Sequence, residues 1–223
     1  MFHGGDILTR NKKEVKQKSK LRELLEAVGT ALLLAFIIRT FVMQAFKIPS
    51  GSMLETLQVG DQLLVNKLSY GTPVDIPFTG REIFHTPRFG DPKHGDVIVF
   101  KYPDNLKRDF IKRVIGVPGD TILIEDKKVY RNGQLLDEPY VIHLDPNTGP
   151  KGDPRDNRGE IVVPEGKYFV MGDNRDKSLD SRFWGFVDRD LIRGKAMILY
   201  WSWNAEAGLT HKVRWERIGD VIH

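Results

Sequence analysis

The sequence LLEAVGTALLLAFIIRTFVMQAFKIPSGSM, residues 24–53, decides the fold class because it joins a strongly apolar stretch directly to a tight turn. Residues 27–38 carry no charge, and Glu26 and Arg39 flank them. A bilayer span needs roughly 20 apolar residues, so a transmembrane helix over 23–45 requires Glu26 at one interface and Arg39 snorkelling toward the other. We predict this membrane helix.

A buried core helix and a cleaved secretory signal also fit the apolar stretch. The core helix would accommodate Arg39, but the core helix of a soluble protein is rarely apolar around its whole circumference. The secretory signal would account for a short apolar region. The motifs that follow the stretch argue against its removal.

Composition narrows the functional classes. The 223 residues carry a net charge of +4 and no cysteine, which excludes thiol catalysis, disulfides and thiolate metal sites. The basic residues gather in the tail, residues 1–22, so the rest of the chain is close to neutral and nucleic-acid binding is poorly supported. By the positive-inside rule this tail is cytoplasmic, and everything from residue 46 onward lies across the membrane. The basic residues of the tail are Arg10, Lys12, Lys13, Lys16, Lys18, Lys20 and Arg22.

Beyond the apolar stretch, short alternating apolar runs predict strands. We expect a mainly β protein, in which one membrane helix precedes an all-β domain over 46–223 with a smaller β subdomain over 121–167. Asn132-Gly133 is typical of a two-residue hairpin turn. Residues 72–94 and 143–160 are rich in Pro, Gly, Asp and Arg and are interpreted as surface excursions. The predicted strands cover 61–68, 95–103, 109–117, 120–126, 127–136, 168–173 and 195–203.

The turn KIPSGSMLETL, residues 47–57, places two serines around a glycine just beyond the apolar stretch. Pro, Ser and Gly are ordinary turn residues, so a plain linker is one interpretation. A serine nucleophile held beside the lipid is the other.

The strand DFIKRVIG, residues 109–116, contains two adjacent cations among apolar neighbours. Period-two alternation places Lys112 on one face with Phe110 and Val114, and Arg113 on the other face. Desolvation favours a neutral lysine, whereas arginine stays charged, so Lys112 is the possible base. An edge strand protected by a lysine is the alternative.

The segment GDNRDKSLDSRFWGF, residues 172–186, combines three acidic and three basic side chains ahead of an aromatic cluster. Such a self-neutralising segment can be partly buried as an ion-pair network that also offers Ser178 and Ser181 as hydroxyl partners. A solvated turn is the alternative.

Taken in order, IPSGSM, GDVIVFKYP, FIKRVIGVPGD and GDNRDKSLDSRFWGFV resemble the type I signal peptidases of bacteria, a family of serine/lysine dyad proteases with a signal-peptidase/LexA-like fold. The resemblance implies that Ser52 is the nucleophile and Lys112 the general base. It also implies that Ser50 contributes to the oxyanion hole and that Ser178 orients the lysine. The supporting charged residues that it implies are Arg113, Asp173, Arg175, Asp180 and Arg182.

The same resemblance implies removal of signal peptides from preproteins that emerge from the secretion machinery, by cleavage after small residues in an Ala-X-Ala setting. It implies neither a cofactor nor a metal. It places the enzyme in the inner (plasma) membrane, with the lipid bilayer as a partner and the catalytic domain on the outer face. The substrate-binding residues that it implies are Phe46, Ile48, Met53, Leu57, Phe110 and Ile111.

Two other functional classes compete with this one. A membrane-anchored β-rich binding module would explain the helix and the strands but leave the Ser and Lys motifs without a role. A self-cleaving regulator of the LexA type uses a related dyad, but the sequence before Ser52 has no room for its DNA-binding domain.

Overall fold

The computed structural model describes residues 20–71, 73–75, 82–87, 89–208 and 212–223. Two compact units divide the chain, the first reaching Ile37 and the second beginning at Ile38. Most of the predicted basic tail, residues 1–19, lies outside the described residues, as does part of the 72–94 excursion.

The first unit contains the α-helix α1 (Lys20–Ile37), none of whose residues is buried. Its large apolar side chains, such as Leu32 and Phe36, are more than half exposed. With the π-helical turn η1 (Ile38–Val42), it is long and apolar enough to cross a membrane. The α-helix ends earlier than the predicted position 45, because the β-branched and aromatic residues after it continue into a strand.

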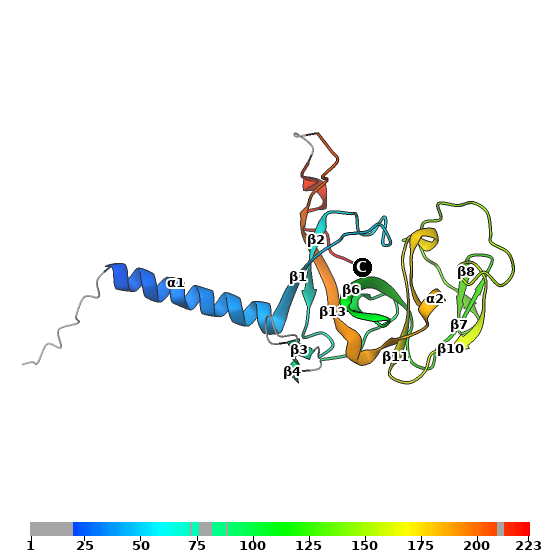
Figure 1. Cartoon of the computed structure of the whole chain (residues 1–223), viewed down its shortest axis with the longest axis horizontal. Coiled ribbons are helices and arrows are strands. Elements are labelled where there is room, and N and C mark those ends of the chain that lie inside the picture. The colour runs from blue at the N-terminus through cyan, green and yellow to red at the C-terminus, as the bar shows by residue number, and fades with distance from the viewer. Residues whose placement is uncertain (1–19, 72, 76–81, 88, 209–211) are drawn as a thin grey trace, which may run out of the picture. The chain divides into compact units, whose positions relative to one another are not determined.

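The second unit is built on a seven-stranded antiparallel sheet (Figure 1). Most of the predicted strands over 61–68, 95–103, 109–117, 168–173 and 195–203 lie in it. In sheet order, its strands are β1 (Met43–Lys47), β2 (Asp61–Asn66), β13 (Ile192–Ser202), β5 (Val97–Tyr102), β6 (Asn105–Gly116), β11 (Lys167–Met171) and β12 (Val187–Asp188).

A four-stranded antiparallel sheet forms within residues 121–162. The hairpin turn at Asn132-Gly133 is confirmed, because Arg131 pairs with Gln134 and both turn residues have the positive φ that this turn requires. At its end, the predicted 143–160 excursion runs into strand β10, which pairs with β7 and was not predicted. In sheet order, the strands are β10 (Arg158–Val162), β7 (Thr121–Glu125), β8 (Lys128–Arg131) and β9 (Gln134–Leu135).

The 72–94 excursion contains a further pair of antiparallel strands, β3 (Pro73–Asp75) and β4 (Glu82–His85). The sequence predicts a surface excursion here but not these two strands. Its Pro- and Gly-rich composition predicts turns, and the two strands, of three and four residues, are too short to show a clear alternating pattern.

Three apolar clusters form the core of the second unit. The first packs Met53 and Leu57, just after Ser52, against the inward side chains of β2 and β13. The second lies on the face of β5 and β6 that carries Phe100 and Val114. The third joins the large sheet to the smaller one and contains Ile115. Complete burial of a side chain such as Leu57 contributes about 1.5–3 kcal/mol, so the chain around Ser52 is firmly anchored.

Candidate active site

Ser52 and Lys112 meet although they come from parts of the chain that are not adjacent in the order of the sheet. Ser52 lies in the turn between β1 and β2, and Lys112 lies in β6. Three strands separate β1 from β6, so the large sheet curls to bring the two residues together (Figure 1). The Nζ atom of Lys112 lies 2.7 Å from Oγ of Ser52, and both side chains are buried. This contact places a serine hydroxyl beside a lysine amine, the arrangement that a candidate nucleophile and base require.

The surroundings of Lys112 favour its neutral form. Its Nζ lies 5.4 Å from the centre of the Phe110 ring and donates a hydrogen bond to the carbonyl oxygen of Ile111. Burial lowers the pKa of Lys112 from 10.5 to about 8, although the carboxylates of Asp180 and Asp173 oppose this shift. A substantial fraction of the amine is therefore unprotonated in weakly alkaline solution.

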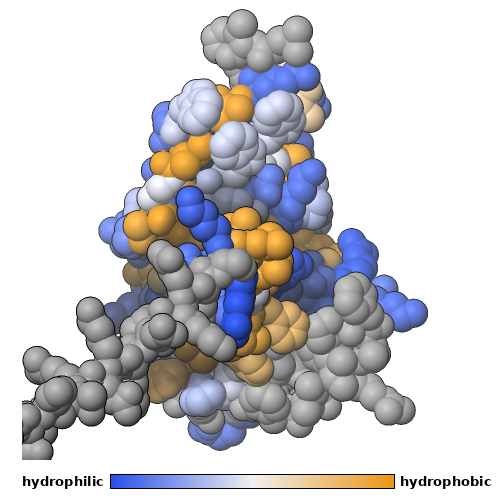
Figure 2. All heavy atoms as spheres, turned by 90° about the vertical axis from the view of Figure 1, so that its left-hand side faces the viewer, coloured by the Kyte–Doolittle hydropathy of each residue, from blue (hydrophilic) through white to orange (hydrophobic). Residues whose placement is uncertain are grey.

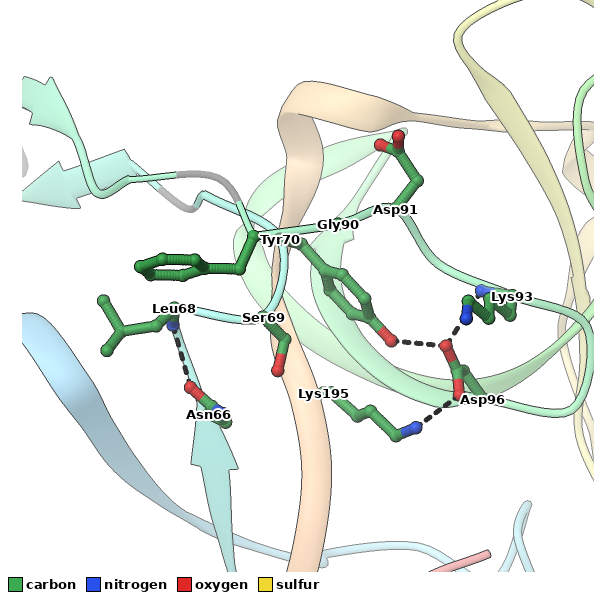
Figure 3. Close-up of a pocket in the computed structure, with 10 residues that line it drawn as sticks. Asn66, Leu68, Ser69, Tyr70, Gly90, Asp91, Lys93, Asp96 and Lys195 are labelled. Atoms are coloured by element: carbon green, nitrogen blue, oxygen red, sulfur yellow. Dashed lines mark hydrogen bonds and ion pairs between the residues drawn. The ribbon is translucent and has the colours of Figure 1, made fainter.

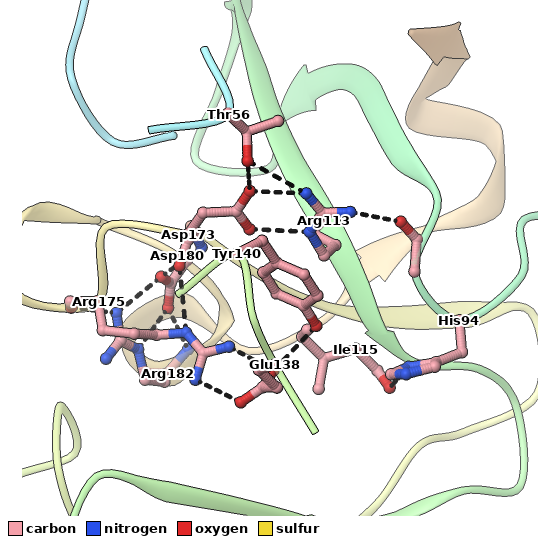
Figure 4. A network of polar contacts seen from close by, with 12 residues as sticks. Thr56, His94, Arg113, Ile115, Glu138, Tyr140, Asp173, Arg175, Asp180 and Arg182 are labelled. Atoms are coloured by element: carbon pink, nitrogen blue, oxygen red, sulfur yellow. Dashed lines mark hydrogen bonds and ion pairs between the residues drawn. The ribbon is translucent and has the colours of Figure 1, made fainter. Parts of the chain in front are cut away.

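Arg113 lies on the opposite face of β6 and has a carboxylate partner. Its Nε and Nη2 atoms lie 2.9 and 2.7 Å from the two carboxylate oxygens of Asp173, and both side chains are buried (Figure 4). The Thr56 hydroxyl donates a further hydrogen bond of 2.6 Å to Asp173. This bidentate, hydrogen-bonded geometry is the kind that buried ion pairs require. The predicted alternation of Lys112 and Arg113 is confirmed.

A second buried ion pair joins Asp180 to Arg182. Asp180 caps the short helix α2 (Ser181–Trp184) and accepts hydrogen bonds from the backbone N–H groups of Gly172 and Arg182. Burial by itself would raise the pKa of Asp180, but the Arg182 guanidinium, 2.9 Å from both carboxylate oxygens, lowers it together with the hydrogen-bonding groups around the carboxylate. The 172–186 segment is therefore a buried network, as the sequence predicted, and not a solvated turn.

Asn174 connects this network to the serine turn. Its backbone N–H donates to the Ser52 carbonyl oxygen, and its side-chain amide donates to the Gly51 carbonyl oxygen, both at 3.1 Å. Gly172 allows the close approach, since a Cβ atom there would lie 2.5 Å from the Ser52 carbonyl oxygen and closer still to Ser178 Oγ. Neither Asn174 nor Gly172 is among the site residues predicted from the sequence.

The two other predicted serines are placed differently. Ser50 is exposed in the same turn as Ser52. Ser178 is buried against Gly172, and its Oγ makes no hydrogen bond of good geometry, although it lies near enough to Asp180 to help lower the pKa of that carboxylate. Among the described residues its Oγ makes no hydrogen bond to Lys112, so the orienting role stays a prediction.

The predicted substrate-binding residues divide by burial. Ile48, Met53 and Leu57 belong to the first apolar cluster and have almost no exposed surface. Phe46 and Ile111 pack against the same cluster but are only half-buried, so they present surface to a ligand. The sixth, Phe110, packs against the second cluster.

Glu138 and Tyr140 also reach the charged network, although neither is predicted from the sequence. Glu138 forms a bidentate ion pair with Arg175, at 2.5 and 3.0 Å. The Tyr140 ring lies 3.9 Å from the Arg113 guanidinium carbon (Figure 4). They follow β9 in a segment with no periodic pattern or motif, so only the folded chain shows where they lie.

A hollow of about 500 Å³ lies away from the serine and the lysine (Figure 3). Its central polar groups already satisfy one another, since the Asp96 carboxylate accepts a hydrogen bond from the Tyr70 hydroxyl and pairs with Lys195. Neither Ser52 nor Lys112 lines it. We therefore locate the candidate chemistry at the serine turn and not in this hollow.

Histidines and metal ligands offer no competing site in the described part of the chain. His94 Nδ1 is hydrogen-bonded to the carbonyl oxygen of Ile115, and His143 lies 3.8 Å from Asp176. Among the described residues, no group of three or more His, Cys, Asp or Glu side chains could hold a metal ion.

Comparison with known proteins identifies the family. The sequence model of the family described as signal peptidase, peptidase S26, matches residues 21–201. The chain belongs to the signal peptidase family. The probable signal peptidase I-2 of Synechocystis is 38% identical over 198 residues, covering 86% of this chain and 79% of that protein. The signal peptidase I of Pseudomonas aeruginosa is 35% identical over 223 residues, covering 86% and 76%.

Among solved structures, a signal peptidase I from Enterococcus faecalis is 35% identical and covers 48% of this chain and 97% of its own. The TM-score of that match is 0.39. The assignment to the signal peptidase family therefore rests on the sequence, and the mainly β architecture rests on the strands described above.

Proposed function

We propose that this member of the signal peptidase family removes signal peptides with Ser52 as nucleophile and Lys112 as general base. The observation that carries the proposal is the 2.7 Å contact between Ser52 Oγ and a buried lysine amine. A serine hydroxyl is a weak nucleophile at neutral pH and needs an adjacent base to accept its proton. Of the two adjacent cations Lys112 and Arg113, only the lysine can serve as that base, because arginine keeps its proton.

The reaction follows from this pair. Neutral Lys112 takes the Ser52 proton while Oγ attacks the scissile carbonyl carbon, and a tetrahedral intermediate with a negatively charged oxygen forms. The protonated lysine then gives this proton to the leaving amine as the C–N bond breaks, which leaves an ester on Ser52. Water attacks the ester, Lys112 accepts one of its protons, and this proton returns to Ser52 as the ester bond breaks. The product leaves as a carboxylic acid, which then loses its proton to solvent.

The oxyanion needs hydrogen-bond donors in the serine turn. From the family resemblance we assign the backbone N–H of Ser52 and the hydroxyl of Ser50 to this role. The exposure of Ser50 supports it, because the hydroxyl has no buried packing to lose when it turns toward a bound substrate. Removal of one such donor typically lowers the turnover rate by about 100- to 1,000-fold.

Two buried ion pairs stabilise the segment that contacts the serine turn. Arg113 with Asp173 and Arg182 with Asp180 hold the 172–182 segment, and Asn174 within it holds the serine turn. Asp173 and Asp180 also raise the pKa of Lys112 against the effect of burial. We assign Arg175 and Ser178 to the same supporting set.

The substrate segment binds as an additional strand in this proposal. In the described residues β1 pairs only with β2, and the first half of β6 pairs only with β5. An extended peptide can add to such free edges through its backbone. Phe46 and Ile111 then border the pockets of the substrate, and their bulk favours small side chains in an Ala-X-Ala setting.

A membrane location fits both units. The exposed apolar residues of α1 would be costly in water, and the basic tail places the N-terminus in the cytoplasm with the catalytic domain on the outer face. The C-terminal segment of the second unit also exposes large side chains, including Trp203 and Trp215. Figure 2 shows pale, weakly polar side chains gathered with apolar ones toward the top of one face. Aromatic rings of this kind are enriched at membrane–water interfaces.

The proposal is tested with a radiolabelled preprotein and the full chain in detergent. Wild-type protein is expected to release the signal peptide after an alanine, and Ser52→Ala is expected to release none. Cleavage by the Ser52→Ala protein at the wild-type rate would refute the proposal. A preprotein whose final signal-peptide alanine is replaced by tryptophan tests the pockets, and its normal cleavage would show that they are misassigned.

A further inference from the structure

The segment from Glu138 to Ile142, called here the strap, follows the smaller sheet and runs beside the charged network. Ile142 N–H donates to the Asp173 carbonyl oxygen at 3.0 Å, and Arg175 N–H donates to the Ile142 carbonyl oxygen at 3.1 Å. These bonds form a parallel bridge between Ile142 and Asn174. The strap therefore fixes the backbone on both sides of Asn174.

Side chains of the strap hold the two arginines nearest to this bridge. The Glu138 carboxylate binds both Nη atoms of Arg175, whose side chain is 2% exposed, and accepts a hydrogen bond of 3.1 Å from the Tyr140 hydroxyl. The Tyr140 ring in turn lies under the Arg113 guanidinium at 3.9 Å, a cation–π contact (Figure 4). Glu138 and Tyr140 thus connect Arg175 to the Arg113–Asp173 pair.

The bridge acts on the serine turn through one residue. Asn174 donates two hydrogen bonds, to the carbonyl oxygens of Gly51 and Ser52. Any displacement of residues 173–175 therefore moves the backbone that carries the Ser52 hydroxyl. A misplacement of about 1 Å can lower a reaction rate by about 100-fold.

We propose that the strap positions Ser52 for attack through Asn174, with Glu138 and Tyr140 as positioning residues. This inference rests on the proposed function of Ser52 and Lys112. It gives the smaller sheet a part in the reaction, because the strap begins three residues after β9 ends.

The strap should change the rate without changing the titration of the base. Burial, Asp180, Asp173 and Arg182 set the pKa of Lys112, and no residue of the strap is among them. A displaced Ser52 lowers kcat at every pH, whereas an altered lysine would move the midpoint of the pH profile. In the described part of the chain, the strap does not contact the free edges of β1 and β6 that we assign to substrate binding, so KM should stay the same.

The test compares Glu138→Gln with Asp120→Asn in the full chain. Both substitutions remove a carboxylate charge from an arginine partner, but Asp120 pairs with Arg131 within the smaller sheet, at 2.7 Å. We expect Glu138→Gln to lower kcat by about 10- to 100-fold, with KM and the pH midpoint unchanged. The control should keep wild-type kcat even where its melting temperature falls. Equal losses of kcat in the two variants would overturn the inference, as would a normal kcat for Glu138→Gln.

A double-mutant cycle identifies the route. If the strap acts through Asn174, the losses caused by Glu138→Gln and Asn174→Ala should combine to less than their product. Full multiplicativity would overturn the route. If Glu138→Gln does not fold, Tyr140→Phe and Tyr140→Leu are compared instead. The phenylalanine keeps a ring under Arg113 and the leucine does not, so only Tyr140→Leu is expected to lower kcat. Ser52→Ala separates the two proposals, since its activity would refute the dyad itself.

Discussion

The two faces of strand β6 give the adjacent cations Lys112 and Arg113 different environments. On one face Lys112 lies over the Phe110 ring and contacts the Ser52 hydroxyl. On the other face Arg113 forms a bidentate ion pair with Asp173. Both side chains are almost completely buried.

The difference shows what burial does to a cation with and without a partner. A directly paired carboxylate compensates for the lost hydration of Arg113, so its charge is retained and supports the fold. Lys112 lacks such a direct partner among the described residues, so its pKa falls and its charge is easily given up. Burial thus gives a structural cation on one face and a candidate base on the other.

The largest effect on activity should come from replacing the lysine at position 112 by an arginine. Lys112→Arg keeps the positive charge but cannot accept the Ser52 proton, so we expect kcat/KM to fall by about 100- to 10,000-fold. Lys112→Ala should be equally inactive. Preprotein cleavage by purified protein measures both, and near-normal turnover of Lys112→Arg would show that the charge, not the proton, matters.

The partner of Arg113 should matter chiefly for folding. Asp173→Asn leaves a buried guanidinium without its carboxylate and should lower the free energy of unfolding by about 3–5 kcal/mol. Urea denaturation in detergent, followed by tryptophan fluorescence, measures this change. An unchanged unfolding midpoint would mean that Arg113 finds another partner.

Removal of the lysine should have the opposite effect on stability. The folded pKa near 8 lies below the unfolded value, so below pH 8 the fold carries a buried charge at a cost that disappears as the pH rises toward 10.5. Lys112→Met should therefore be inactive but more stable than wild type by up to about 3 kcal/mol at pH 7. The gap in unfolding free energy should close between pH 8 and 10.5. A gap that is independent of pH would contradict a depressed lysine pKa.

The pH profile of activity sharpens the same point. Only neutral Lys112 accepts the Ser52 proton, so the rate should rise about tenfold per pH unit up to about pH 8 and then level off. Phe110→Ala admits water to the lysine and raises its pKa, which should move the midpoint to higher pH. A midpoint unchanged by this substitution would assign the desolvation to other groups.

The smallest effect should come from an exposed pair. Lys167 and Asp188 lie 2.5 Å apart at the surface, with side chains 40% and 55% exposed. Water and salt screen such a pair, so Asp188→Asn should change the free energy of unfolding by less than about 1 kcal/mol. A loss as large as that of Asp173→Asn would remove the distinction between paired charges inside and outside the fold.

Local pattern was enough to predict much of this architecture. Alternating apolar residues mark the strands of the large sheet, and Asn132-Gly133 marks a hairpin whose positive φ angles the structure contains. The alternation in β6 also placed Lys112 and Arg113 on opposite faces. These features depend on residues close together in the sequence, which is why they can be read from it.

Other features depend on contacts between distant segments. Asn174 meets Gly51 across 123 positions, and Glu138 meets Arg175 across 37, and neither separation follows from a periodic pattern. The end of α1 also differs from the prediction, because an apolar run suits a helix and a buried strand equally well. Strand β1 begins at Met43, and its pairing with β2 decides the outcome.

The short turn between β5 and β6 sets the register in which the two strands pair, and this register decides which side chain faces Ser52. Ile98 is opposite Lys112 and Val97 is opposite Arg113, and the hairpin closes through Pro103 and Asp104. A slip of one residue in this alignment would invert every side chain of the strand, so that arginine would face the serine and lysine the aspartate. Composition, charge and the number of ion pairs could all survive such an error, yet the hydroxyl would have no proton acceptor. The two residues of a surface turn therefore help to specify which cation lies beside the serine.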